Sequence, residues 1–116
     1  MIVDDEELAL AEYQEFMELH GISCDVESDP KRALQRILAS KDIAMVVTDL
    51  RMPSMSGVEL ISSIRKSLPA DRRMSFVIAS GYVDVSSVSS LPDVEVISKP
   101  VDLDVLMKFV REGLSA

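Results

Sequence analysis

Acidic, hydroxyl and ammonium side chains follow four apolar segments of this sequence, each at the point where a strand is expected to end. In an open parallel sheet, the carboxyl ends of the strands gather at one edge, which is where such sheets bind ligands. Three carboxylates, one hydroxyl and one ammonium at one edge favour a site for a divalent cation and a phosphoryl group. The side chains are Asp4, Asp5, Asp49, Ser80 and Lys99, after segments 1–3, 45–48, 76–79 and 94–97.

The adjacent acids Asp4 and Asp5 repel each other unless a cation lies between them. Mg²⁺ suits such a pair, because it takes oxygen ligands and is usually held by one or two carboxylates together with water and phosphate. A solvated loop before a helix is the alternative, since acids near a helix N-terminus are favoured by the helix dipole. The other three motifs favour the cation.

Each of the remaining motifs also allows two interpretations. The carboxylate of Asp49 could act as a nucleophile that forms an acyl phosphate, or it could close an Asx turn. Ser80, followed by Gly81, could donate its hydroxyl to a phosphoryl oxygen, or form an ordinary Ser-Gly turn. Lys99 could neutralise a phosphoryl group or be solvated, and Pro100 after it rigidifies the turn and allows a cis bond.

Apolar strands alternate five times with amphipathic helices along the chain. This alternation predicts right-handed crossovers and a parallel sheet, and therefore a three-layer α/β sandwich. Residues 22–26 alternate in polarity, which is typical of an edge strand, whereas 44–48 form an apolar run typical of a strand buried on both faces. The expected strands are 1–3, 22–26, 44–48, 76–79 and 94–97. The expected helices are 7–20, one that opens at Pro30 and has inward positions as far as Leu38, 57–68, 83–90 and 103–114.

Local signals mark where three of these helices begin. Asp29 is an N-cap followed by Pro30 at the first helical position, and Ser56 and Asp102 are the other N-caps. His20, the sole histidine, is expected to pack or to cap the end of its helix rather than to donate a phosphoryl group. The residues expected to face the core are Ala9, Tyr13, Phe16, Met17, His20, Ala33, Leu34, Ile37, Leu38, Leu60, Ile61, Ile64, Leu68, Leu103, Leu106, Met107, Val110 and Leu114.

Size and composition narrow the class of protein. The 116 residues, 47% of them apolar, are expected to form one domain over 1–116. A formal net charge of −8 argues against direct binding to nucleic acid or to anionic membranes. Because its apolar runs are short and its first residues carry no basic charge, neither a membrane-spanning helix nor a signal peptide is expected. Cys24 is the single cysteine, which fits a reducing cytoplasm. Since strands usually run about five residues, the first strand is expected to begin upstream of Met1.

The ordered motifs resemble the receiver domains of two-component response regulators over essentially the whole chain. The signature consists of the Asp4-Asp5 pair, the segment 49–53 with Gly57 eight residues after the Asp, the Ser80-Gly81 pair and Lys99-Pro100. The resemblance implies a flavodoxin-like fold, with a five-stranded parallel sheet in the order 2-1-3-4-5 and five helices.

The resemblance also implies a role for each site residue. Asp49 would accept a phosphoryl group from a phosphohistidine of a sensor kinase or of a histidine phosphotransfer protein. Asp4, Asp5, Asp49 and the backbone carbonyl of Arg51 would gather around Mg²⁺. Lys99 would pair with the acyl phosphate, and Ser80 would turn inward to bond it.

Three positions bear on how such a domain would signal. Most receivers place an aromatic residue three positions before the lysine, where this chain has Val96, so the usual output face is in question. Tyr82 could take part of that role. Arg51 and Tyr82 occupy the two positions that tune the lifetime of the phosphoryl group in the family, and their size predicts slow hydrolysis.

Two other classes compete with a phosphoacceptor module, which would not be an enzyme with a separate substrate. An aspartyl-nucleophile phosphatase would need a second acid two residues after Asp49, where Arg51 stands. A pseudo-receiver would bind partners without being phosphorylated, although every acceptor residue is present. The sequence leaves the kinase and the output open, including an attached or separate effector, a hybrid kinase and an activation-dependent homodimer.

Overall fold

Five parallel strands form the centre of the computed structural model, which describes residues 1–81 and 91–115. The strand order β2-β1-β3-β4-β5 confirms the flavodoxin-like sheet. Tyr82 and the helix expected over 83–90 lie outside the described residues. The strands are β1 (Ile2–Val3), β2 (Val26–Glu27), β3 (Met45–Asp49), β4 (Ser75–Ser80) and β5 (Val94–Ser98). The helices of the described part are α1 (Glu7–Leu19), α2 (Pro30–Ala39), α3 (Gly57–Ser67) and α5 (Leu103–Ser115).

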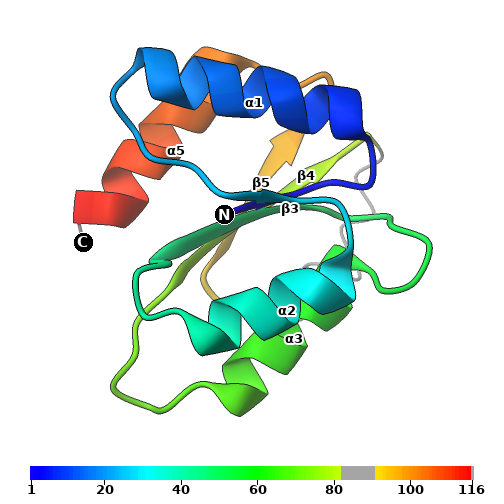
Figure 1. The fold of residues 1–116 in the computed structure, drawn as a ribbon, viewed down its shortest axis with the longest axis vertical. Helices are drawn as coiled ribbons and strands as arrows, with labels where there is room; N and C mark the ends of the chain where they lie inside the picture. Colours follow the sequence, from blue (N-terminus) through cyan, green and yellow to red (C-terminus); the bar gives the residue numbers. More distant parts are fainter. Residues whose placement is uncertain (82–90, 116) are drawn as a thin grey trace.

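The sheet lies between two helical layers, with α1 and α5 on one face and α2 and α3 on the other (Figure 1). Successive side chains of a strand point to opposite faces, so β3 contributes to two cores. Met45 and Val47 pack on the side of α1 and α5. Val46 packs on the side of α2 and α3. This alternation also decides on which side of the sheet each side chain at the strand ends must lie.

The three predicted helix starts are confirmed. The Asp29 carboxylate accepts a hydrogen bond from the Lys31 N–H at 3.0 Å, with Pro30 at the first helical position. Ser56 and Glu59 form a reciprocal capping box at the start of α3. The Asp102 carboxylate accepts from the Asp104 N–H at 2.9 Å. Each signal is local in sequence, which is why it could be interpreted without knowledge of the packing.

Several residues expected in the core lie at the surface instead. Leu38 and Leu114 are 40% and 47% exposed, and each lies one residue before the end of its helix. His20 is exposed, and its ring is hydrogen-bonded to the Phe16 carbonyl oxygen at 2.9 Å. Of the two predicted roles, it therefore caps the end of α1 and does not pack in the core. Ala44, expected in the buried strand run, is exposed just before β3.

The edge strand is shorter than predicted, with Val26 and Glu27 alone in the ladder. Its neighbour β1 pairs with it at two positions, Ile2 with Val26 and Val3 with Glu27. The short ladder still has a consequence for the acidic pair, because the Asp4 N–H donates to the Glu27 carbonyl oxygen at 3.3 Å. Within the described ranges, no helix is long and apolar enough to cross a membrane.

Helix α3 connects the two ends of the sheet. It begins near the carboxyl end of β3 and runs back toward the end of the sheet at which β4 begins. Near its last turn, the Arg65 guanidinium lies over the Phe76 ring at 5.0 Å and donates to the Pro92 carbonyl oxygen at 2.7 Å. Pro92 directly precedes Asp93, which has a left-handed backbone (φ 59°), and then β5. The far end of α3 is therefore tied to the turn that starts β5.

Candidate functional site

Two acidic residues leave the end of β1 and differ in exposure. Asp4 is buried at 3% exposure, whereas Asp5 is exposed. The Asp4 carboxylate accepts from the Glu6 N–H at 2.9 Å, which orients it as the chain turns toward α1. Asp4 follows Val3 by one residue, so it lies on the same side of the sheet as Ile2, toward α1 and α5.

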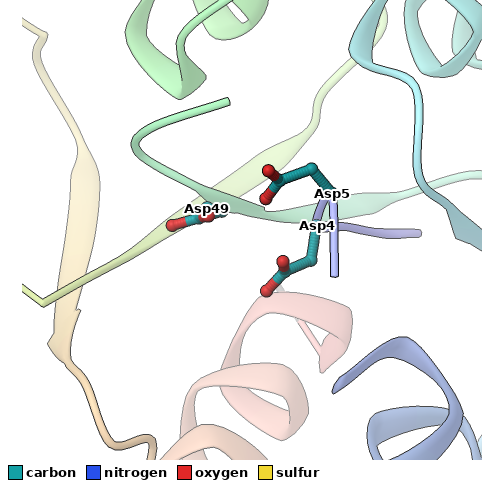
Figure 2. Close-up of side chains that lie close together, drawn as sticks. All are labelled: Asp4, Asp5 and Asp49. Atoms are coloured by element: carbon teal, nitrogen blue, oxygen red, sulfur yellow. The ribbon is translucent and has the colours of Figure 1, made fainter. Parts of the chain in front are cut away.

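Asp49 ends β3 and brings the third carboxylate to this edge. It has the same parity as Met45 and Val47, so it also lies on the side of α1 and α5. One carboxylate oxygen from each of Asp4, Asp5 and Asp49 lies within 4.8 Å of the others. Figure 2 shows the three side chains gathered where β1 and β3 end. The predicted convergence of the two strand ends on one acidic cluster is observed.

Lys99 joins the cluster from the next residue after β5. Its Nζ lies 3.1 Å from Asp49 Oδ1 and 3.4 Å from Asp4 Oδ2. Its side chain is 28% exposed, whereas the Asp49 side chain is 12% exposed. The ammonium therefore bridges two carboxylates that are largely withdrawn from water. The peptide bond between Lys99 and Pro100 is cis.

The surroundings shift the pKa of both members of the Lys99–Asp49 pair. Burial raises the pKa of Asp49 above its ordinary value, the hydrogen bond and charge of Lys99 oppose this, and the carboxylates of Asp4 and Asp5 reinforce it. Burial lowers the pKa of Lys99, but the hydrogen bond and charge of Asp49 and the charge of Asp4 outweigh it, so this pKa is raised. Burial is thus the largest cause of the shift at Asp49, whereas the neighbouring carboxylates decide the shift at Lys99.

Replacing Lys99 by methionine is expected to raise the pKa of Asp49 further, because the hydrogen bond and positive charge that oppose the shift are both removed. A carboxyl ¹³C NMR titration of the metal-free protein measures the change. Lys108→Met, on the exposed surface of α5, removes the same charge away from the cluster and should leave Asp49 as in the parent. An Asp49 titration that is equal in both variants would contradict this electrostatic account.

The donor set fits a small, hard divalent cation. All of the converging groups are carboxylate oxygens, which Mg²⁺ prefers, and nitrogen or sulfur ligands that would favour zinc are not among them. A cation would also offset the cost of burying the Asp49 charge and the repulsion of this charge by Asp4 and Asp5. Asp4, Asp5 and Asp49 are therefore able to hold Mg²⁺ together.

The other predicted site residues lie beside this cluster. Ser80 is buried at the end of β4, and its carbonyl oxygen accepts from the Lys99 N–H at 2.8 Å. Arg51 is exposed in the loop between β3 and α3, two residues after Asp49. Val96, where receivers usually carry an aromatic residue, is 40% exposed on β5. The side chains of the acidic pair, Asp49 and Lys99 therefore meet at one edge. The main chain of Ser80 lies next to Lys99, but its side chain has the parity of Phe76 and Ile78, on the side of α2 and α3.

Sequence reasoning missed part of the support behind these residues. Glu27 holds the Asp4 main chain, and its own buried carboxylate pairs with Arg36 at 3.4 Å. Gly57 was noted for its spacing, but its contact with Asp49 was not: a Cβ built on Gly57 would lie 2.4 Å from the Asp49 carbonyl oxygen. The sequence does not predict these contacts, because the partners of Glu27 and Gly57 are brought to them by the packing of β1 and β3.

Comparison with known proteins places this arrangement in a large group. Residues 1–111 match the family described as "Response regulator receiver domain". The chain is 32% identical to a response regulator receiver protein of known structure from Pseudomonas putida, with a TM-score of 0.85 over 96% of this chain and 93% of that one.

Two curated relatives are much longer than this chain. The two-component response regulator PprB of Pseudomonas aeruginosa is 27% identical over 71% of this chain, and a cyclic di-GMP phosphodiesterase of Thermotoga maritima is 24% identical over 98% of it. In both cases the match covers 30% of the relative's length.

Proposed function

Because this chain belongs to the response regulator receiver domain family, we propose that Asp49 accepts a phosphoryl group from a phosphohistidine in a Mg²⁺-dependent reaction. The observation that carries this proposal is the Lys99 ammonium, held 3.1 Å from Asp49 and 3.4 Å from Asp4 beside three converging carboxylates. This set combines a nucleophile, a cation and a metal-binding group, which in-line phosphoryl transfer needs for positioning and charge neutralisation.

Each residue of the site has its own role in the proposed transfer. An Asp49 carboxylate oxygen attacks phosphorus, a P–O bond forms, and the P–N bond to the donor imidazole breaks as the imidazole leaves. Lys99 stabilises the negative charge on the acyl phosphate, and the Ser80 hydroxyl donates to a phosphoryl oxygen. Mg²⁺, held by Asp4, Asp5, Asp49 and the Arg51 carbonyl, would neutralise charge on the transferring group.

The proposed partners follow from this chemistry. The donor is a histidine kinase or a histidine phosphotransfer protein, and the module acts as a switch rather than as an enzyme with its own substrate. Residues 1–116 would work as one domain that controls an attached or separate effector, with pairing of two phosphorylated copies as one mode of output. The single thiol of Cys24 fits a reducing, cytoplasmic setting.

Incubation with acetyl phosphate tests the proposed transfer directly. With Mg²⁺ present, intact-mass spectrometry should show the gain of one phosphoryl group, and the same mixture with EDTA should show none. Treatment with hydroxylamine should remove the added mass, because it cleaves acyl phosphates. If the protein gains no mass with Mg²⁺, the chain is a pseudo-receiver that acts without phosphorylation. A gain that resists hydroxylamine would place the group on a residue other than an aspartate.

A further inference from the structure

The main chain at Asp49 is fixed by two neighbouring elements. The Leu50 N–H donates to the Ala79 carbonyl oxygen of β4 at 3.0 Å. The Gly57 N–H, at the first residue of α3, donates to the Leu50 carbonyl oxygen at 2.8 Å. The N–H of the peptide that follows Asp49 is therefore held by β4, and the carbonyl of the next peptide is held by α3.

Thr48 contacts the Asp49 carbonyl on the face of the sheet that packs against α2 and α3. It is fully buried at 0% exposure and lies on the side of α2 and α3, opposite to the Asp49 carboxylate. Its Oγ1 donates to the Asp49 carbonyl oxygen at 3.0 Å. Its methyl carbon faces Gly57, at 3.1 Å from a Cβ built there. The Asp49 carbonyl is thus confined between the Thr48 hydroxyl and the Cα of Gly57.

A hydroxyl at this depth is unexpected on packing grounds alone. Val46, two residues earlier on the same face of β3, is equally buried and apolar. Valine has nearly the shape of threonine and carries no group to desolvate, so it would fill the position of Thr48 without the penalty of burying a hydroxyl. The hydroxyl is instead used to orient one particular carbonyl, that of the residue whose carboxylate meets Lys99.

We propose that Thr48 is a positioning residue for the phosphoacceptor, and this assignment rests on the proposed function. By fixing the Asp49 carbonyl, its hydroxyl sets the plane of the following peptide. That plane determines the direction in which the Asp49 carboxylate leaves the strand and the course of the chain toward Arg51, whose carbonyl is a proposed Mg²⁺ ligand. Thr48 itself lies on the far side of the sheet and touches neither the metal nor the phosphoryl group.

Three variants separate positioning from packing. Thr48→Val keeps the shape and removes the hydroxyl, whereas Thr48→Ser keeps the hydroxyl and removes the methyl. Val46→Ala removes buried volume from the same face of β3 without touching the Asp49 carbonyl. For each, we would measure Mg²⁺ affinity by calorimetry, the rate of phosphorylation by acetyl phosphate, the unfolding midpoint, and the ¹³C resonance of the Asp49 carbonyl.

Thr48→Val is expected to bind Mg²⁺ more weakly and to be phosphorylated more slowly, each by about fivefold, as for the loss of one hydrogen bond. Its unfolding midpoint should fall less than that of Val46→Ala. The Asp49 carbonyl resonance should shift in Thr48→Val and keep its parental position in Thr48→Ser, which should also recover metal binding and rate. Val46→Ala should lose stability and keep parental Mg²⁺ affinity.

The results also distinguish this assignment from the proposed function. If the parent binds Mg²⁺ and gains a phosphoryl group while Thr48→Val matches it in both, the assignment to Thr48 is wrong and the proposed function stands. An equal loss in Thr48→Ser and Thr48→Val would likewise overturn it, since the hydroxyl would then be irrelevant. If the parent neither binds Mg²⁺ nor gains mass, both the function and the assignment fall.

Discussion

Asp49→Asn is expected to abolish phosphorylation by acetyl phosphate, because the amide lacks the carboxylate oxygen that attacks phosphorus. The effect should be complete rather than partial, since the other groups of the site stabilise charge and do not replace the nucleophile. Intact mass after incubation with Mg²⁺ measures the result. Retained Mg²⁺-dependent mass gain in Asp49→Asn would show that another residue is the acceptor.

Loss of folding should not explain that result. Burial and the like charges of Asp4 and Asp5 raise the pKa of Asp49 against the opposing effect of Lys99, so ionising this carboxyl costs more in the metal-free fold than in water. A neutral amide at this position removes that penalty, although it also ends the pairing with Lys99. Asp71→Asn, an exposed acid in the loop before β4, is the matched control and should be phosphorylated like the parent.

Gly57→Ala is expected to have the second largest effect. A Cβ on this residue would lie 2.4 Å from the Asp49 carbonyl oxygen, closer than real Cβ atoms approach backbone, and in tight contact with the Thr48 methyl carbon at 3.1 Å. Either α3 or the end of β3 must therefore move. Overpacking of this kind costs about 1–3 kcal/mol of stability, and the displaced carbonyl should reduce Mg²⁺ affinity as well. Denaturant unfolding and calorimetry measure the two effects.

Gly81→Ala is the matched control, because Gly81 belongs to the same edge of the sheet. Among the described residues, the nearest neighbour of a Cβ there would be the Lys99 Cβ at 4.0 Å, which is ordinary contact. This variant should keep a stability near that of the parent. If Gly57→Ala were as stable as Gly81→Ala and bound Mg²⁺ equally well, the close contact between α3 and Asp49 would not constrain the site.

The sequence predicted the features that depend on short-range chemistry. The caps at Asp29, Ser56 and Asp102 follow from bonds within two or three residues, and all three are present. The strand order and the edge at which the motifs gather follow from the alternation of strands and helices together with the family resemblance. Asp4, Asp49 and Lys99 were accordingly expected together, and two ion pairs join them.

Features that depend on tertiary packing were predicted less well. The periodicity of α2 and α5 does not say where the sheet stops, so Leu38 and Leu114 were wrongly assigned to the core. The central stripe of α1 runs through Leu10 and Met17 rather than through His20. The contact of Gly57 with the Asp49 carbonyl depends on how α3 approaches β3, which spacing alone does not specify.

Helix α3 contacts both the Asp49 main chain and the turn before β5. Its first residue lies against the Asp49 carbonyl, and in its last turn the Arg65 guanidinium donates a hydrogen bond to the Pro92 carbonyl oxygen. Eleven residues at the α-helical rise give a rod of ~16 Å between these fixed ends. The start of β5 is therefore joined to the Asp49 main chain by two routes, one through the hydrogen bonds of β4 and one through this single helix.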